Sequence, residues 1–202
     1  PFDHRSGVFA IPAMSSDPGD SQAHTGEVIE LLPGLLDAGA GTLVLFSSRR
    51  QLNDVFDGLD EPVQKRILRQ DDWSKQELLS RHRERVDEGA ASVIFGLASF
   101  AEGVDLPGNY CRAVIIAKLP FPVPDNPVDA TLAEWLEDQG RNPFMEISVP
   151  EAAQRLVQAA GRLLRTEKDT GRITLLDRRL LTRRYGAAII ESLPPFARDF
   201  VS

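Results

Sequence analysis

Short apolar runs alternate along this chain with longer stretches in which apolar residues recur every three to four positions. The runs are typical of strands buried on both faces, and the amphipathic stretches are typical of helices. Strands are predicted at 8–13, 42–46, 65–70, 92–97, 112–118 and 172–177. Helices are predicted at 24–38, with an interruption near Pro33, and at 49–59, 74–89, 129–139, 151–166 and 182–193. This alternation indicates an α/β fold, a mostly parallel sheet with helices on both faces.

One of these helices has an unusual polar face. In "EAAQRLVQAAGRLLRT", at 151–166, each residue turns by about 100° from the one before. The rotation places Gln158, Arg162 and Arg165 together, opposite Leu156, Ala160 and Leu163. Gly161 lies beside the polar face, where glycine costs roughly 1 kcal/mol relative to alanine. One interpretation is a solvated face. The other is a site where two guanidinium groups share an anion such as a triphosphate, with glycine permitting a close approach.

A loop with two acids follows the strand predicted at 92–97. In "SFAEGVDLPG", at 99–108, Glu102 and Asp105 flank Gly103. Ligands bind where loops leave the carboxyl ends of parallel strands, so this position favours a functional loop. Its acids suit ribose hydroxyls, the water shell of Mg²⁺ or an arginine partner. The alternative is a polar turn in which Gly103 has a positive φ and Gly108 forms a second turn.

Composition narrows the class of protein. The 202 residues suffice for a sizeable core, and we expect one domain over 1–202. The net charge of −7 argues against a generally basic nucleic-acid binder, but residues 151–186 hold nine Arg and Lys against four Asp and Glu, which suggests a focused anion site. The single cysteine, Cys111, and three scattered histidines predict no metal site. Cysteine usage fits a reducing cytoplasm, and no apolar run suits a membrane span.

Three segments together resemble a known family. "QAAGRLLR", at 158–165, resembles motif VI of superfamily 2 helicases, Q-x-x-G-R-x-x-R. "SFAEGVDLPG" is similar to motif V of the DinG/XPD-like branch, and "LVLFSSRRQL", at 43–52, resembles motif IV. "AKLPFPVPDNPV" and "GRITLLDRRLL" are similar to the bacterial DinG-type members. The likeness covers nearly the whole chain in order, and motifs V and VI are its most specific part.

The resemblance implies a RecA-like fold and the second, C-terminal motor domain of an ATP-dependent DNA helicase. Such a domain shares ATP and Mg²⁺ with the first RecA-like domain of the same parent protein and steps 5′ to 3′ along single-stranded DNA, here in the bacterial cytoplasm or nucleoid. By motif, Arg165 and Arg162 would reach the γ-phosphate, with Arg165 as the arginine finger. The other residues implied at the nucleotide are Gln158, Gly161, Glu102, Gly103 and Asp105. Those implied at the DNA are Ser47, Ser48, Arg50, Ser99 and Lys118, although Arg50 replaces an aromatic residue often found at its position.

The 202 residues contain no G-x-x-x-x-G-K-[ST] phosphate loop and no D-E-x-H box. "DAGAGT", at 37–42, precedes a strand rather than following one, so Gly39 and Gly41 are predicted to form a helix cap and a turn. We therefore expect the chain to be part of a larger protein and to be inactive alone as an ATP hydrolase. The iron–sulfur cysteines of some relatives belong to the other motor domain, and whether the parent has a cluster stays open.

Other readings of the chain stay open. A RecA-like module that only binds nucleic acid or a protein partner would not need Arg162 and Arg165. A stand-alone α/β enzyme acting on a phosphorylated small molecule is disfavoured, because no nucleophile–base pair or metal cluster is evident. Two local features carry separate predictions. Asp177 and Arg179 are predicted to form a structural ion pair, since a buried acid needs a partner, and Trp135 is predicted to pack its helix.

Overall fold

The computed structural model describes residues 7–122, 127–161 and 170–201. Within them a seven-stranded sheet has the order β3-β4-β2-β5-β6-β1-β7, and every neighbouring pair is parallel. The strands are β1 (Gly7–Ile11), β2 (Gly41–Phe46), β3 (Ile67–Arg69), β4 (Ser92–Leu97), β5 (Ala113–Ile116), β6 (Gly171–Leu175) and β7 (Ala197–Phe200). The first six confirm predicted strands. The edge strand β7, "ARDF", was missed because it has no apolar run.

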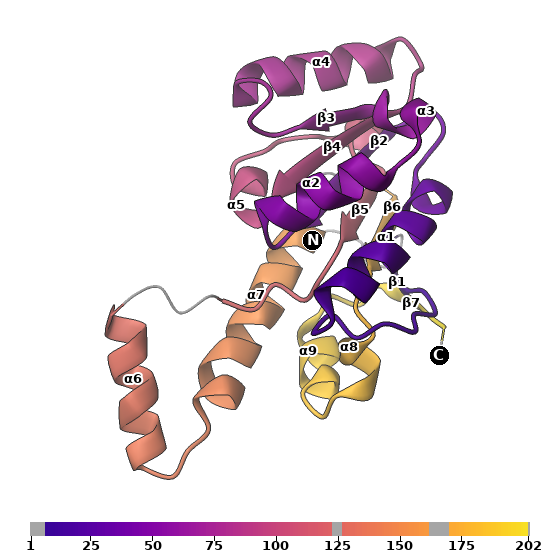
Figure 1. The fold of residues 1–202 in the computed structure, drawn as a ribbon. Helices are drawn as coiled ribbons and strands as arrows, with labels where there is room; N and C mark the ends of the chain where they lie inside the picture. The colour runs from indigo at the N-terminus through magenta and orange to yellow at the C-terminus, as the bar shows by residue number, and fades with distance from the viewer. Residues whose placement is uncertain (1–6, 123–126, 162–169, 202) are drawn as a thin grey trace.

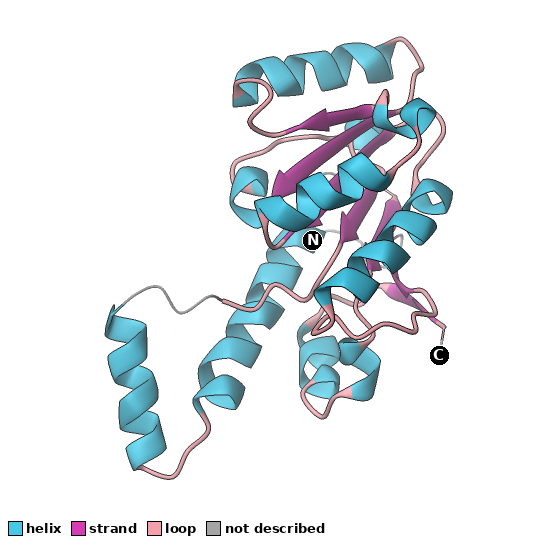
Figure 2. Ribbon diagram, in the orientation of Figure 1, coloured by secondary structure: helices cyan, strands magenta, loops and turns pink. Residues whose placement is uncertain are grey.

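Helices lie on both sides of the sheet (Figure 2). They are α1 (Ser21–Leu35), α2 (Arg49–Gly58), α3 (Glu61–Gln64), α4 (Lys75–Asp87), α5 (Ala98–Ala101), η2 (Gly108–Tyr110), α6 (Pro127–Asp138), η3 (Phe144–Ser148), α7 (Val149–Ala160), α8 (Arg179–Thr182) and α9 (Gly186–Ser192). The helix predicted at 182–193 corresponds to α9, and only its first residue, Thr182, lies in α8. The short α3 and α5 were not predicted, because four residues show no helical period.

Alternate residues of a strand pack into two separate halves of the core. In β2, Leu43 and Leu45 join a cluster with residues of α4, α7 and α9, whereas Val44 and Phe46 join a cluster with residues of α1 and α2. Figure 1 shows α1 and α2 in front of the sheet. Because successive strand side chains point to opposite faces, a strand apolar at every position must be covered on both sides. The predicted α/β architecture is confirmed.

Local signals set most of the helix starts. Ser74 precedes α4, and its Oγ accepts a hydrogen bond from the Glu77 N–H at 3.2 Å. Asp20 caps α1 in the same way through Ala23. The predicted interruption near Pro33 is wrong, because α1 runs on to Leu35. Proline removes one hydrogen bond, but its position in the last turn leaves little helix beyond it to lose.

The predicted cap and turn in "DAGAGT" are also wrong. The preceding helix ends at Leu35, and Gly41 is the buried first residue of β2. A Cβ on Gly41 would lie 1.9 Å from the carbonyl oxygen of Tyr110, whereas a Cβ on Gly39 would meet nothing within 4 Å. Glycine is therefore required at position 41 by a close approach of two backbones.

The prediction that Trp135 packs its helix against the rest of the protein is wrong as well. The helix α6 stands apart from the sheet in Figure 1 and leads back to the body through η3 and α7. The Trp135 side chain is half exposed, at 52% of its surface, and of its neighbours on α6 Leu136 is the buried one. The helical period placed Leu136 and Trp135 correctly on a helix but could not say which of them faces protein.

Candidate functional site

The carboxyl edge of the sheet brings together three predicted DNA-contacting residues. Ser47 follows β2, Ser99 lies in α5 directly after β4, and Lys118 follows β5. Because β2 lies between β4 and β5, the three loops are neighbours. Together with Phe121 and Arg155, these three side chains line a cavity of about 240 Å³. Its hydroxyl, ammonium and guanidinium donors suit a polyanion such as a nucleic-acid backbone.

The other two DNA candidates, Ser48 and Arg50, do not line this cavity. Ser48 caps α2, where its Oγ accepts a hydrogen bond from the Gln51 N–H at 3.2 Å, so its own proton is left for a ligand. Arg50 lines a separate groove between α1 and α2, with its side chain 90% exposed and Asp54 at 3.7 Å. The structure thus does not bring Arg50 to the other four predicted DNA contacts.

The acid loop is held by the core and leaves its carboxylates outward. Val104 and Leu106 are buried, while Glu102, Gly103 and Asp105 are exposed. Gly103 has a φ of 71°, the positive value that the polar-turn interpretation gave it. The backbone carbonyls of Glu102 and Asp105 accept hydrogen bonds from Lys75 and Arg83 of α4, at 2.6 and 2.9 Å. The helix α4 therefore fixes the backbone of the loop.

A second cavity, also of about 240 Å³, joins the acid loop to the polar face of α7. Glu102 and Ser99 line it from one side, and Gln158 and Arg155 line it from α7. Gln158 is exposed, and Leu156 and Ala160 are buried, as predicted for the two faces of this helix. The predicted catalytic residues Arg162 and Arg165 lie outside the described residues. Gly103 and Asp105 do not line this cavity.

Arg155 is the residue that sequence reasoning missed. It lines both cavities and forms an ion pair with Glu151, one turn earlier on α7, at 2.5 Å. The available signal was its spacing, because Arg155 precedes Gln158 by three positions and so shares its helix face. The guanidinium of Arg155 therefore adds positive charge to both cavities, at the place where they adjoin.

Gly161 ends α7 with helical backbone angles. A Cβ placed there would meet only the carbonyl oxygens of Gln158 and Val157, at 3.4 and 3.6 Å. Packing within the described chain therefore does not require glycine at this position.

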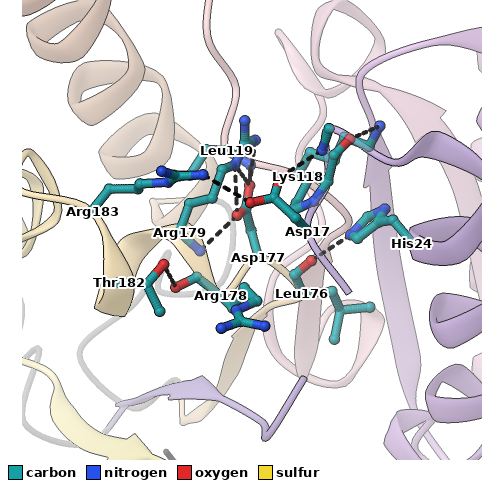
Figure 3. A network of polar contacts seen from close by, with 12 residues as sticks. Asp17, His24, Lys118, Leu119, Leu176, Asp177, Arg178, Arg179, Thr182 and Arg183 are labelled. Carbon is teal, nitrogen blue, oxygen red and sulfur yellow. Dashed lines mark hydrogen bonds and ion pairs between the residues drawn. The ribbon is translucent and has the colours of Figure 1, made fainter. Parts of the chain in front are cut away.

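The carboxyl end of β6 carries a network of polar contacts (Figure 3). Asp177 is fully buried and forms the predicted ion pair with Arg179, whose terminal nitrogen lies 2.7 Å from Oδ2. Asp177 also contacts the loop after β5, where the N–H of Leu119 donates to its carboxylate at 2.8 Å. Burial lowers the pKa of Lys118, and the nearby Arg179 lowers it further. Burial also opposes the charge of Arg179, but the hydrogen bonds and charge of Asp177 outweigh it and raise its pKa.

Across residues 7–122, 127–161 and 170–201, no helix is long and apolar enough to cross a membrane. The same ranges contain no group of three or more His, Cys, Asp or Glu side chains that could hold a metal ion.

A parallel sheet with these loops at its carboxyl edge defines a RecA-like α/β domain. The chain belongs to the helicase C-terminal domain family, whose model matches residues 35–196. Solved structures with the same fold include an XPD helicase, with a TM-score of 0.66 and 22% identity over 96% of this chain and 35% of that one. Xpd4 of S. tokodaii gives 0.68 and 18% over 97% and 38%. At these identities the two structures show the fold alone.

Relatives of higher identity come from bacteria. The ATP-dependent DNA helicase DinG of Photobacterium profundum is 45% identical over 203 residues, which cover 98% of this chain and 29% of that protein. DinG of Escherichia coli K12 is 37% identical over 97% of this chain and 28% of that protein. These matches confirm the resemblance to the DinG/XPD-like branch. The chain spans less than a third of the length of these curated relatives.

Proposed function

We propose that this chain is the second motor domain of an ATP-dependent DNA helicase that moves 5′ to 3′ on single-stranded DNA. The observation that supports this best is the pair of adjoining cavities at the carboxyl edge. Residues of the motif IV, V and VI segments, represented by Ser47, Glu102 and Gln158, line them although they are distant in sequence. A motor domain must couple a nucleotide site to a DNA site, and adjoining cavities offer a direct route for coupling.

The nucleotide side of the proposal rests on the cavity between the acid loop and α7. Its polar groups fit ATP and Mg²⁺ in part: the Glu102 carboxylate could accept from a ribose hydroxyl or a magnesium-bound water, and the Gln158 amide suits a phosphate-bound water. Bound Mg·ATP supplies the γ-phosphoryl group that is transferred to water. This chain would contribute the positive charge of Arg165 and Arg162, while the first RecA-like domain of the parent would contribute the phosphate loop. Gly161, Gly103 and Asp105 would shape and support the site.

The DNA side rests on the cavity that Ser47, Ser99 and Lys118 line. Ser47 and Ser99 offer hydroxyls and Lys118 an ammonium group, and donors of these types bind phosphates without reading sequence. Ser48 and Arg50 would extend the contact along α2. An acidic chain with a cationic cavity at this edge favours weak, salt-sensitive binding of a single strand.

Substitution of Arg165 tests the proposal in the full-length protein. Arg165→Ala is expected to lower DNA-stimulated ATP hydrolysis by about 10³ to 10⁵, the range for arginine fingers in phosphoryl transfer, while ATP binding changes little. The reason is that such a finger stabilises charge that develops only in the transition state. Arg165→Lys is expected to restore little, because an ammonium cannot reproduce the planar fork.

The measurements are the ATPase rate and the affinity for a fluorescent ATP analogue in one preparation, with melting temperature as the folding control. Arg66→Ala is the matched control, since Arg66 is an exposed arginine that precedes β3, at the opposite edge of the sheet. A folded Arg165→Ala protein with a near-normal ATPase rate would overturn the proposal and favour a non-catalytic binding module.

A further inference from the structure

A buried carboxylate holds the loop that follows β5. Asp177 is fully inaccessible to solvent at the end of β6. Its Oδ2 accepts the backbone N–H of Leu119 at 2.8 Å, and its Oδ1 accepts the backbone N–H and the Nε of Arg179, each at 3.0 Å. An anion this deeply buried is stable only with such partners. The same carboxylate therefore fixes both a guanidinium and the backbone of residues 117–121.

The ion pair contacts that loop a second time, through Arg179. Its guanidinium carbon lies 5.5 Å from the centre of the Phe121 ring, within cation–π range. Phe121 lines the same cavity as Lys118. The Asp177–Arg179 pair thus contacts two residues that follow Lys118, Leu119 through a backbone hydrogen bond and Phe121 through its ring.

The other contact of Lys118, with Pro18, also depends on a residue next to α8. The Lys118 ammonium donates to the carbonyl oxygen of Pro18 at 3.3 Å, a long hydrogen bond. The loop that carries Pro18 is held by Arg183, which follows α8 and pairs with Asp17 at 3.0 Å. Figure 3 shows Lys118 and Asp17 on one side of this network and Arg179 and Arg183 on the other. Both supports of Lys118 therefore lead back to residues 177–183.

Lys118 has unused capacity for an anion. An ammonium has three donors, and within the described part of the chain its acceptor is the carbonyl of Pro18 at long range. Its charged neighbours are Asp177, already committed to Arg179 and Leu119, and Arg179, which repels it. The side chain is half-buried at the cavity that Ser47 and Ser99 also line. A phosphate in that cavity would complete the coordination of Lys118.

We propose that Asp177 and Arg179 are positioning residues for DNA binding, which hold Lys118 at the cavity so that it contacts one backbone phosphate of the single strand. The inference rests on the proposed function. It gives the ion pair a role beyond satisfying a buried acid, because the pair acts through Lys118. A pair that only stabilised the fold would affect the melting temperature and leave the contribution of Lys118 to binding intact.

A double-mutant cycle in the full-length protein separates these roles. The variants are Lys118→Ala, Arg179→Lys and both together, and the probe is a fluorescein-labelled oligothymidylate whose anisotropy is followed at several salt concentrations. Arg179→Lys keeps the charge beside Asp177 and loses the fork, so the protein is expected to fold. Arg183→Ala, which breaks an exposed pair, is a second variant in case Arg179→Lys does not fold.

Each single variant is expected to weaken binding about tenfold, as for one hydrogen bond to a charged group. Each should also reduce the slope of log K against log salt by about 0.7, the value for one phosphate on a single strand. The double variant should be no weaker than Lys118→Ala alone, because both changes remove the same contact. Arg172→Lys is the matched control, since its pair with Asp199 lies near the opposite end of β6, and it should bind as the wild type does.

Two results would overturn the inference. Losses that add in the double variant, or a wild-type salt slope in both Arg179→Lys and Arg183→Ala, would show that the pair does not act through Lys118, with the proposed function untouched. Failure of the wild-type protein to bind the oligonucleotide at all would overturn the proposed function and this inference with it.

Discussion

The close approach of Gly41 to Tyr110 predicts a large loss of stability from one methyl group. In Gly41→Ala the new Cβ would lie 1.9 Å from the Tyr110 carbonyl oxygen and 2.7 Å from Nε2 of His82. Real Cβ atoms essentially never come within 3.0 Å of such atoms, so the carbonyl must move by about 1 Å. That carbonyl accepts a 2.7 Å hydrogen bond from buried His82, which the movement would break or bend.

Two costs add in this variant. Overpacking a well-filled core costs about 1–3 kcal/mol, and leaving a buried hydrogen-bonding group unpaired costs about 1–3 kcal/mol. The expected loss in the free energy of unfolding is therefore roughly 2–6 kcal/mol, a large part of the 5–15 kcal/mol that is usual for a domain.

Urea unfolding of residues 1–202, followed by circular dichroism, measures this loss. Gly39→Ala is the matched control, because a Cβ there meets nothing within 4 Å, and it should stay within about 0.5 kcal/mol of the wild type. The midpoint of Gly41→Ala should fall with little change in the slope. A Gly41→Ala chain as stable as the Gly39→Ala chain would refute the reasoning from the close approach.

Two further predictions concern pH and activity. Stability should decrease as the pH falls below about 6.5, because burial lowers the pKa of His24 and of His82 and keeps both neutral in the fold, so the unfolded chain binds more protons. Each histidine contributes at most about 1.4 kcal/mol to the free energy of unfolding per pH unit. Urea unfolding at pH 7.5 and 5.5 measures this dependence. An equally steep dependence in His24→Gln would count against a contribution from His24. Residues 1–202 alone should hydrolyse no ATP in a coupled assay, since they lack a phosphate loop; turnover that Arg165→Ala abolishes in the isolated chain would contradict this.

Similarity to known proteins identifies the family of this chain but does not assign a role to every residue of the site. The family assignment follows from the match of the family model over residues 35–196 and from a relative that covers 98% of this chain. The roles of single residues require the structure as well, because Arg155 lines both cavities without belonging to a motif pattern. Its contribution can be judged only beside Gln158 and Ser99, which it approaches in space.

Local physics made much of this protein predictable from its sequence. Apolar runs marked β2, β4 and β5, the helix predicted from residue 74 begins after its cap at that position, and helical spacing put Gln158 on the face opposite Leu156 and Ala160. The acids of motif V were expected beside a strand end, and Gly103 has the positive φ that its turn requires. Each of these depends on neighbours within about one turn or one strand, and such interactions are written directly into the order of residues.

Only the tertiary structure decided which of these pieces meet. Strand order places β2 between β4 and β5, and so brings Ser47, Ser99 and Lys118 to one cavity; no spacing along the chain encodes that order. The same order sets β6 beside β5, which lets Asp177 hold the loop with Lys118. The need for glycine at position 41 and the exposure of Trp135 likewise depend on backbone approach and on packing between distant segments. Contacts of this kind arise from the packing of the whole core, to which every element contributes.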